Sequence, residues 1–314
     1  MHLGLSSRSC GLLFALLSVT VFAIQDGVSK HIGALYPVNF VIMLRFWIFA
    51  MFVVMIAGRS KGGVSSAVRT RRPVLQIGRG LLLANQFVVS TYAFAHVGLA
   101  QTHAIFASTP LLVACLSVPI LGEAVGWRRW GAIGIGFFGV LLIINPVDMK
   151  IDASVALPAL CAINFALYST LTRLVAGSDT PATSFFYAGM TGAVVMSIIG
   201  PFYWTTIAFA DWPWMIALCL SGIAAHYFLI RAYDLLDAVV VQPMSYLQTV
   251  LVCIIGVVVY NETMTEVMVI GSTIVVLAGL LTIWGEAKSR PSNQIVLKEL
   301  AQADPDVETN SRNL

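Results

Sequence analysis

Charged residues are scarce in this sequence, and their scarcity excludes a soluble protein. Asp, Glu, Lys and Arg make up 11% of the 314 residues, whereas a soluble domain carries roughly a quarter. Hydrophobic residues make up 58%, and the mean hydropathy is +0.87. So few charges cannot cover the surface of a soluble fold of this size. The sequence therefore predicts an integral membrane protein.

Several catalytic motifs are also missing from the sequence. There is no Gly-x-x-x-x-Gly-Lys-Ser/Thr phosphate loop, which argues against an ATP-driven pump, and no His-Glu-x-x-His zinc helix. The five cysteines are scattered without the spacing of a metal site. Ser221-Gly222 precedes His226, but five residues put that pair on different helical faces and the Gly-x-Ser-Gly form of an intramembrane serine protease is absent. We expect no enzyme activity, no metal and no cofactor.

Ten predominantly apolar runs of about 20 residues are present, each long enough to cross a bilayer. Because lipid offers no hydrogen-bond partner to the backbone, such runs must be helices, and the fold class is an all-α polytopic membrane protein. The first run resembles a secretory signal peptide, but nine further runs favour an uncleaved helix. The predicted spans are 10–31, 38–57, 74–96, 102–121, 130–147, 153–172, 182–201, 213–233, 238–259 and 267–285.

The distribution of Lys and Arg predicts the orientation, because cytoplasmic loops are enriched in these residues. With a cytoplasmic N-terminus, the outer loops contain only Lys30 and Lys150, and both chain termini lie inside. The net charge of +3 then reflects topology, so no nucleic-acid partner is expected. The inner segments contain Arg8, Arg59, Lys61, Arg69, Arg71, Arg72, Arg128, Arg129, Arg173, Arg231, Lys288, Arg290, Lys298 and Arg312.

The two halves of the chain repeat each other. Glu123 and Glu262 stand at matching points of residues 10–147 and 153–285, and the polar residues 286–314 read as a disordered cytoplasmic tail. Each half has five spans, and because five is odd the second half enters the membrane inverted. Inverted five-helix repeats are typical of secondary transporters, whose substrate site lies near the midplane.

Four charged residues near the span ends are candidates for gating or coupling. Glu123 and Glu262 each precede a helix, where the positive end of the helix dipole favours a carboxylate. They can act as helix caps, or they can gate the path or carry protons. Asp26 and Lys30 are four residues apart, so they can pair on one helix face or belong to an outer gate.

Polar side chains within the spans are the candidates for a substrate site, because they are costly in a bilayer and are often functional there. Amides and tyrosines suit a neutral, polar, aromatic solute. The structural alternative is that they hydrogen-bond neighbouring helices or, for His226, that it is a core histidine. The candidates are Arg45, Asn85, Gln86, Thr109, Asn164, Tyr168, His226, Tyr246 and Gln248.

The first half contains the motifs "LGE" at 121–123 and "GAIGIGFFGVLLI" at 131–143, and the second half contains one related copy of this pattern. This pattern resembles the EamA-type drug/metabolite transporters over about residues 10–285. The stretches "AIQDGVSKHI" and "AHYFLIRAYDLLDAVVVQPMSYLQ" are most similar to bacterial importers of riboflavin, with S-adenosylmethionine importers second.

The resemblance implies a secondary transporter of the bacterial inner membrane that imports a small metabolite, riboflavin first, by alternating access. An S-adenosylmethionine importer, an exporter of amino acids or drugs on the same fold, and a membrane receptor that transports nothing are the alternatives. The expected partners are a small-molecule solute and the lipid bilayer. The sequence leaves the oligomeric state open, a homodimer included.

Overall fold

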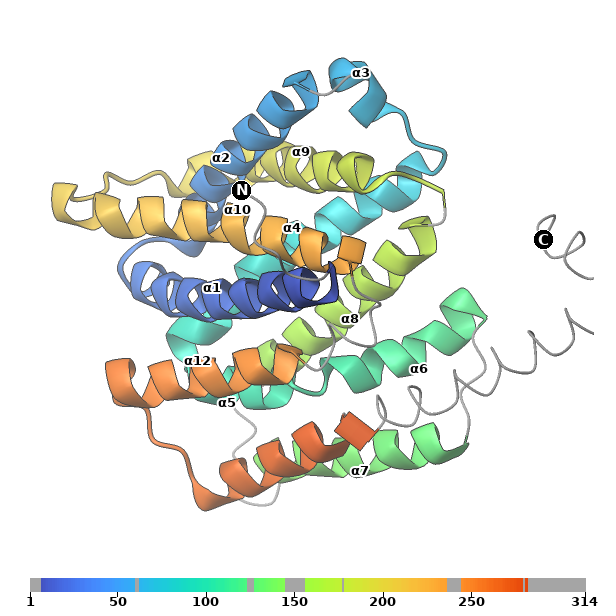
Figure 1. Ribbon diagram of the computed structural model, residues 1–314. Coiled ribbons are helices and arrows are strands. Elements are labelled where there is room, and N and C mark those ends of the chain that lie inside the picture. Colours follow the sequence, from blue (N-terminus) through green and yellow to red (C-terminus); the bar gives the residue numbers. More distant parts are fainter. Residues whose placement is uncertain are drawn as a thin grey trace, which may run out of the picture.

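The computed structural model describes residues 7–59, 62–122, 127–144, 156–176, 178–235, 244–278 and 280–281. Their regular structure is helical throughout, with no strand in these ranges (Figure 1). The α-helices are α1 (Ser7–Leu35), α2 (Val38–Arg59), α3 (Gly63–Val68), α4 (Pro73–His96), α5 (Leu99–Phe106), α6 (Thr109–Leu121), α7 (Trp127–Ile144), α8 (Ala156–Ala176), α9 (Pro181–Ile199), α10 (Trp212–Leu235), α12 (Met244–Tyr260) and a last helix, Glu266–Ala278. Two short 3₁₀ helices, η2 (Gly200–Tyr203) and η3 (Phe209–Asp211), lie between α9 and α10.

Five stretches of helix in the described part of the chain are long and apolar enough to cross a membrane. At 1.5 Å per residue a 22-residue helix spans about 33 Å, which matches the hydrocarbon core. The expectation of a polytopic membrane protein is therefore confirmed, while the ten-span layout stays a prediction. These stretches are Ser9–Leu35, Val38–Arg59, Leu99–Leu121, Ala182–Tyr203 and Phe209–Leu229.

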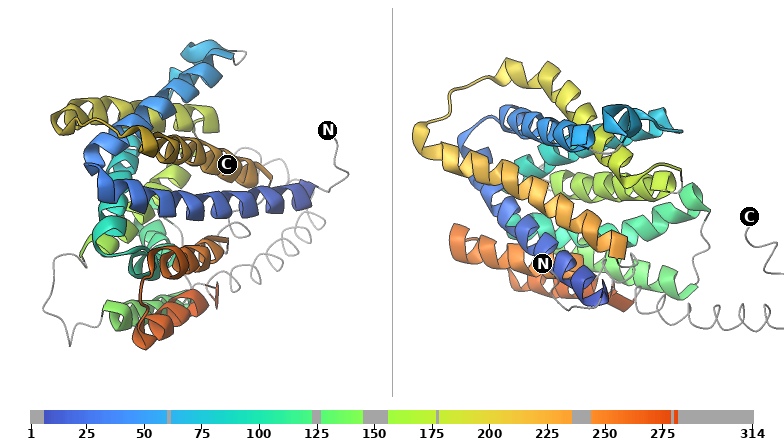
Figure 2. Two further views of the ribbon diagram at one scale, coloured as in Figure 1. Left: turned by 90° about the vertical axis from the view of Figure 1, so that its left-hand side faces the viewer. Right: turned by 45° about the horizontal axis from the view of Figure 1, so that its top comes forward.

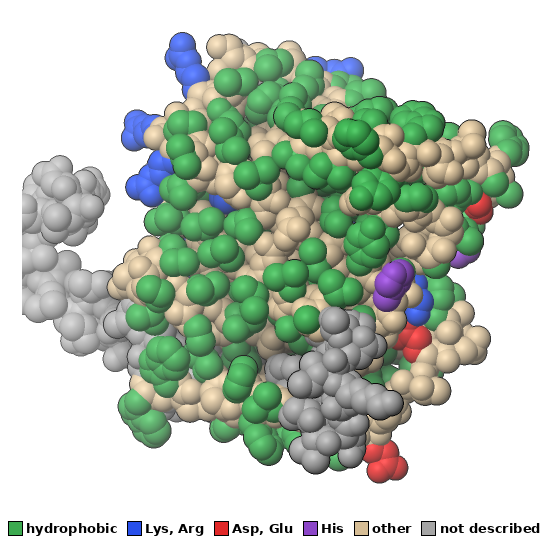
Figure 3. Space-filling model, turned by 180° about the vertical axis from the view of Figure 1, so that it is seen from behind, with side chains coloured by type: hydrophobic (Ala, Val, Ile, Leu, Met, Phe, Trp, Pro, Cys, Tyr) green, Lys and Arg blue, Asp and Glu red, His purple; other side chains and the backbone are tan. Residues whose placement is uncertain are grey.

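The surface of the molecule is apolar where a soluble protein would be polar. Hydrophobic side chains are spread over the whole face in Figure 3, whereas most of the visible Lys and Arg lie toward one edge and Asp, Glu and His lie at the opposite edge, where a basic side chain also lies. Met51, Phe138 and Val258 are among the large apolar side chains that point outward. A lipid-facing belt with charged ends accounts for this arrangement.

Helix α1 occupies the middle of the bundle. It packs against α10, α12 and α4, and it lies between α10 and α12 in Figures 1 and 2. Its buried side chains include Ala15, Ala23 and Ile32. Helix α2 packs on α9, and α4 packs on α8 as well as on α9. Segments from the two halves of the sequence therefore alternate in space.

Small residues allow the close helix contacts, as expected for helices in a membrane. A Cβ atom added at Gly139 of α7 would lie 2.9 Å from the backbone oxygen of Gly271, so these two helices touch almost backbone to backbone. At Gly136 the added atom would meet Leu111 at 2.0 Å and Ala278 at 3.3 Å. The glycines of α7 thus allow close packing against α6 and the last helix.

The fourth predicted span is broken in the middle. Helix α5 ends at Phe106 and α6 begins at Thr109, with Pro110 in its first turn, where proline is tolerated because it lacks an N–H group. The hydroxyl groups of Ser108 and Thr109 donate to the backbone oxygens of Ile105 (2.7 Å) and Phe106 (2.6 Å). These bonds satisfy carbonyls that an unbroken helix would have paired. The broken span is the one that borders the cavity described below.

The contact between α4 and α9 can be tested with two glycines on one helix. A Cβ atom at Gly80 would lie 2.4 Å from Cβ of Thr191, whereas at Gly78 it would meet nothing within 4 Å. We expect Gly80→Ala to destabilise the protein by about 1–3 kcal/mol through overpacking. Gly78→Ala should be neutral or slightly stabilising, because alanine is the better helix former. Thermal unfolding in detergent measures both, and equal melting temperatures for the two variants would contradict this packing.

Candidate functional site

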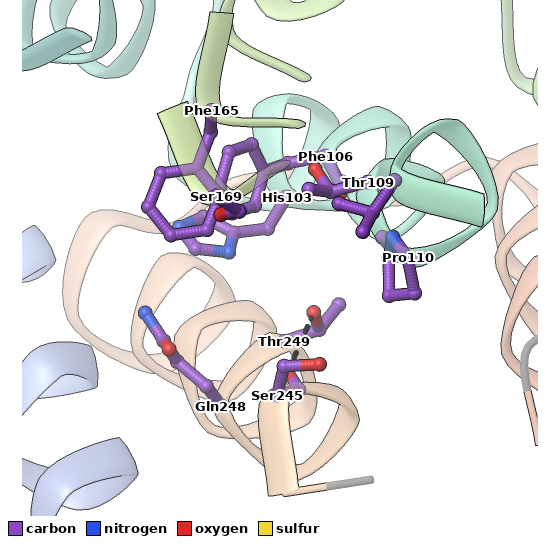
Figure 4. Close-up of a pocket in the computed structure, with 11 residues that line it drawn as sticks. His103, Phe106, Thr109, Pro110, Phe165, Ser169, Ser245, Gln248 and Thr249 are labelled. Atoms are coloured by element: carbon purple, nitrogen blue, oxygen red, sulfur yellow. Dashed lines mark hydrogen bonds between the residues drawn. The ribbon is translucent and has the colours of Figure 1, made fainter. Parts of the chain in front are cut away.

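A small cavity lies where α5, α6, α8 and α12 meet (Figure 4). Its volume is about 50 Å³, which is room for a few water molecules, whereas metabolite pockets are about 300–1,000 Å³. In this conformation the cavity is therefore too small to hold a metabolite. Both halves of the chain line the cavity, through His103, Phe106, Ala107, Thr109, Pro110, Val113, Phe165, Ser169, Ser245, Gln248 and Thr249.

The carboxylate of Asp26 on α1 is held by two residues of the cavity wall. Nε2 of Gln248 donates to Oδ2 of Asp26 at 3.0 Å, and Nε2 of His103 lies 3.2 Å from the same oxygen. Neither ring nitrogen of His103 has a hydrogen bond of good geometry among the described residues, and its ring stacks on Phe94. Asp26 is only 8% exposed. A carboxylate thus lies inside the bundle beside the cavity.

His103 is a residue that the sequence analysis missed. It falls in the second residue of the predicted span 102–121, where it reads as a span end, and the structure buries it in α5. Its signal was available, since a histidine within an apolar run is as costly as the amides that were singled out. Only the packing of α5 on α12 and α1 shows which carboxylate it faces.

The expected pairing of Asp26 with Lys30 along α1 is wrong. The Lys30 ammonium instead pairs with Glu262, and Asp26 faces Gln248 and His103. Residues four apart on a helix share a face only approximately, and α1 is packed on several helices. Each charge therefore finds its partner on a different neighbouring segment.

Glu262 caps a helix, but not the helix that follows it in sequence. Its two carboxylate oxygens accept the backbone N–H groups of Leu99 at 2.7 Å and Ala100 at 2.8 Å, which open α5. Together with Lys30, this carboxylate joins α1, α5 and the segment after α12. The cap expected on span ten is therefore a cap on span four. The N-terminal end of the α5 dipole and its free N–H groups explain the preference for a negative charge.

Local backbone geometry brings Glu262 to this place. Asn261 has φ +52°, in the left-handed region that ends helices, and the N–H of Glu262 donates to the Gly256 oxygen at 3.0 Å. A Cβ atom at Gly98, whose φ is +105°, would lie 3.2 Å from the carboxylate. Gly122, at the matching point of the first half, also has positive φ, +70°. Glu123 itself lies outside the described residues, as do Pro243 and the tail 286–314.

Glu262 is ionised more readily than an ordinary glutamate. Its partial burial by itself would raise the pKa, but the bonds from Lys30, Ala100 and Leu99 together outweigh that effect, and the pKa lies below its usual value of 4.5. A carboxylate held by hydrogen bonds to its charged form behaves in this way. The contact is therefore a charged one at neutral pH.

Some candidates connect helices instead of lining the cavity. Nδ2 of Asn164 donates to the Leu82 oxygen at 3.1 Å and to Oε1 of Gln86 at 3.3 Å, which joins α8 to α4. The Tyr168 ring lies under the Arg79 guanidinium, 5.3 Å from its central carbon. These contacts match the structural alternative of interhelical bonding.

The remaining candidates fall in different environments. Nδ1 of His226 lies 2.9 Å from the Gly222 oxygen of its own helix, and its ring contacts Phe22 and Phe87. The Tyr246 hydroxyl is buried without a partner among the described residues. Asn85 is exposed on the outside of α4, so the structure does not bring it to the other candidates. Of the predicted midplane residues, only Thr109 and Gln248 border the cavity.

A family model describing EamA-like transporters matches residues 9–145 and again residues 153–284. The chain belongs to the EamA-like transporter family. The family resemblance expected from the sequence motifs is therefore confirmed. Proteins of this family are transporters rather than enzymes.

Curated relatives in this family carry different solutes. An S-adenosylmethionine uptake transporter of Rickettsia prowazekii (strain Madrid E) is 27% identical over 90% of this chain and 95% of its own. A riboflavin transporter of Vibrio cholerae is 25% identical, over 91% of this chain and 97% of its own. A pseudopaline exporter of Pseudomonas aeruginosa is 22% identical, over 85% and 94%. Riboflavin, the first expectation, is less well supported than S-adenosylmethionine.

A solved structure described as a crystal structure of protein has the same fold. It superposes with a TM-score of 0.62 and covers 88% of this chain and 97% of its own, at 20% sequence identity. At that identity the match speaks for the fold alone. The arrangement of helices around the cavity is therefore that of a known fold.

The charged contact of Glu262 predicts a pH-dependent stability. Because the pKa of Glu262 is lowered by folding, its contribution is present above about pH 4.5 and is lost as the pH falls through the folded-state pKa. We expect Glu262→Gln to lower the free energy of unfolding by about 1–3 kcal/mol at pH 7, with the deficit shrinking below pH 4.5. Melting temperatures in detergent from pH 7 to pH 3.5 measure this. Glu266→Gln, an exposed change of the same kind, is the control, and a deficit independent of pH would contradict the prediction.

Proposed function

We propose that this protein takes up S-adenosylmethionine across the bacterial inner membrane by alternating access of two inverted five-helix halves. The observation that carries the proposal is the Asp26 carboxylate beside a cavity lined by both halves. S-adenosylmethionine carries a permanent positive charge on sulfur, which a buried carboxylate attracts. Riboflavin is neutral and gains nothing from that charge.

Three observations support the layout of two inverted halves. The family model matches twice, once in each half. When each helix of one half is replaced by its counterpart in the other half, the contact of α1 with α10 becomes the contact of α8 with α4, and both contacts are present. The contacts of α2 with α9 and of α5 with α12 are unchanged by this replacement. Positive-φ turns at Gly122 and Asn261 both precede a glutamate. An inverted repeat places the solute site between halves that rock against each other.

The orientation that we propose has both termini in the cytoplasm. Most of the Lys and Arg visible in Figure 3 lie toward one edge of the molecule, and the positive-inside rule assigns such an edge to the cytoplasm. The Lys30–Glu262 contact then lies on the outer side, where it ties α1 to the start of α5. We propose that this contact closes the outer side and breaks when the site opens outward.

Uptake by purified protein in liposomes tests the proposed substrate. We expect time-dependent accumulation of labelled S-adenosylmethionine, and less uptake of labelled riboflavin by at least tenfold, because only the former has a cation for Asp26. Liposomes without protein are the control. Accumulation of riboflavin without S-adenosylmethionine would replace the proposed substrate, and the V. cholerae relative makes riboflavin the second candidate.

The role of the cavity is tested with two amides that face in different directions. Gln248 borders the cavity and holds Asp26, whereas Asn85 is exposed on the outside of α4. Gln248→Leu leaves a buried carboxylate without its donor, a loss of about 1–3 kcal/mol, so we expect uptake to fall about tenfold or more. Asn85→Leu should leave uptake within about twofold of the parent. Equal uptake by both variants, at equal amounts in the membrane, would place the path elsewhere.

A further inference from the structure

A second cleft lies beside α1, among α2, α4 and α10. It is narrow, and its most polar member is the Arg45 guanidinium. Its walls are Arg45, Phe49, Phe87, Cys219, Gly222, Ile223 and His226.

Arg45 is a buried cation that forms no ion pair among the described residues. It is 5% exposed, and Nη2 has no hydrogen-bond partner among the described residues. The ion pairs found in the described ranges are those of Lys30 and of Asp26, so neither includes Arg45. An unpaired charge in a membrane interior is costly and is seldom retained without a function.

The guanidinium is held with one edge free. Its flat face stacks on Phe87, with the central carbon 3.8 Å from the ring centroid, a cation–π contact that fixes the plane. The edge that carries Nη2 and Nε faces Gly222. A Cβ atom at that glycine would lie 3.1 Å from Nη2 and 3.3 Å from Nε, so the missing side chain leaves space in front of the donors.

The opposite charges of the two clefts are arranged around α1. Gln25 faces the second cleft, since its unpaired Oε1 would lie 3.2 Å from the same added atom at Gly222. The next residue, Asp26, faces the first cavity through Gln248 and His103. The neighbouring residues Gln25 and Asp26 thus face two clefts of opposite charge, with the Asp26 carboxylate beside one and the Arg45 guanidinium in the other.

We propose that Arg45 binds the carboxylate of the transported solute, so that the solute class is a zwitterion with its cation toward Asp26. This inference rests on the proposed function and goes further, because it assigns the anionic end of the solute. Guanidinium donors in a planar fork match a carboxylate, and such charge-assisted bonds are strong. S-adenosylmethionine has both groups, a carboxylate and a sulfonium, whereas a neutral flavin has neither.

The test compares two ligands that differ only in the carboxylate. Binding of labelled S-adenosylmethionine to the purified protein in detergent is competed with unlabelled S-adenosylmethionine and with its decarboxylated form, which keeps the sulfonium, the amine and the adenosine. The parent protein should prefer the carboxylated ligand by about 10- to 100-fold. Arg45→Gln should abolish this preference by weakening only the carboxylated ligand, and Arg45→Lys, which keeps the charge, should retain part of it.

Two further variants separate the site from general damage. Gly222→Ala places a methyl group in front of the donors and should reduce the preference while Arg45 is intact. Arg79→Gln removes another buried arginine, whose guanidinium is hydrogen-bonded to Gln76 and Thr172, and should leave the preference unchanged. If Arg45→Gln weakened both ligands alike, Arg45 would be structural and the inference overturned.

The outcomes for the inference and for the proposed function differ. A parent protein that binds both ligands equally overturns the carboxylate site and leaves S-adenosylmethionine as the solute. A parent protein that binds neither ligand but binds riboflavin overturns the proposed function and the inference with it. A carboxylate preference that requires Arg45 supports both.

Discussion

A polar group withdrawn from water inside an apolar bundle must find a partner, and the interior of this protein is organised around that constraint. Lys30, Leu99 and Ala100 converge on the Glu262 carboxylate, so three segments meet at one charge. The hydroxyl groups of Ser108 and Thr109 donate hydrogen bonds to backbone oxygens at the break between α5 and α6. Each of these contacts either joins segments that are distant in sequence or pairs backbone groups at a break in a helix. The need to pair buried polar groups therefore constrains how the helices are placed.

Several buried polar atoms around α1 have no hydrogen-bond partner among the described residues. Nη2 of Arg45, Oε1 of Gln25 and the ring nitrogens of His103 are buried without good hydrogen bonds among the described residues. A carrier needs such groups, because a site that is fully satisfied when empty gains nothing from a polar solute. The small cavity and the narrow cleft suit a closed conformation in which the solute path is shut.

In the proposed alternating access, helix packing sets which parts of the bundle move together. The close contact of Gly139 with Gly271 and the alternation of helices from the two halves let rigid units slide with little rearrangement of side chains. The Glu262 contact differs in kind, since it is a charged contact between segments, and we propose that it breaks when the site opens outward. Packing thus defines the moving bodies, and a few charged contacts hold one of their arrangements.

Much of the fold followed from the sequence, because hydrophobic run length and charge distribution are local properties of the chain. They predicted helices within nearly the right bounds and an apolar surface. The repeated motifs led to the EamA-like family. For Glu262 the sequence left a helix cap, a gate and a proton carrier open, and the cap that the structure shows is on α5 and not on the helix that follows Glu262.

The partners of the polar residues were decided by tertiary structure alone. The sequence suggested that Asp26 pairs with Lys30, and it placed Asn85 in the site and left His103 out. Side chains project in all directions around a helix, and only packing decides which side of α1 or α4 faces lipid and which faces another helix. Composition and periodicity determined that this chain is a bundle of membrane helices with costly polar groups inside. Which of those groups meet was decided by contacts between residues as far apart as Asp26 and Gln248, since such contacts depend on rotation and register that no local pattern encodes.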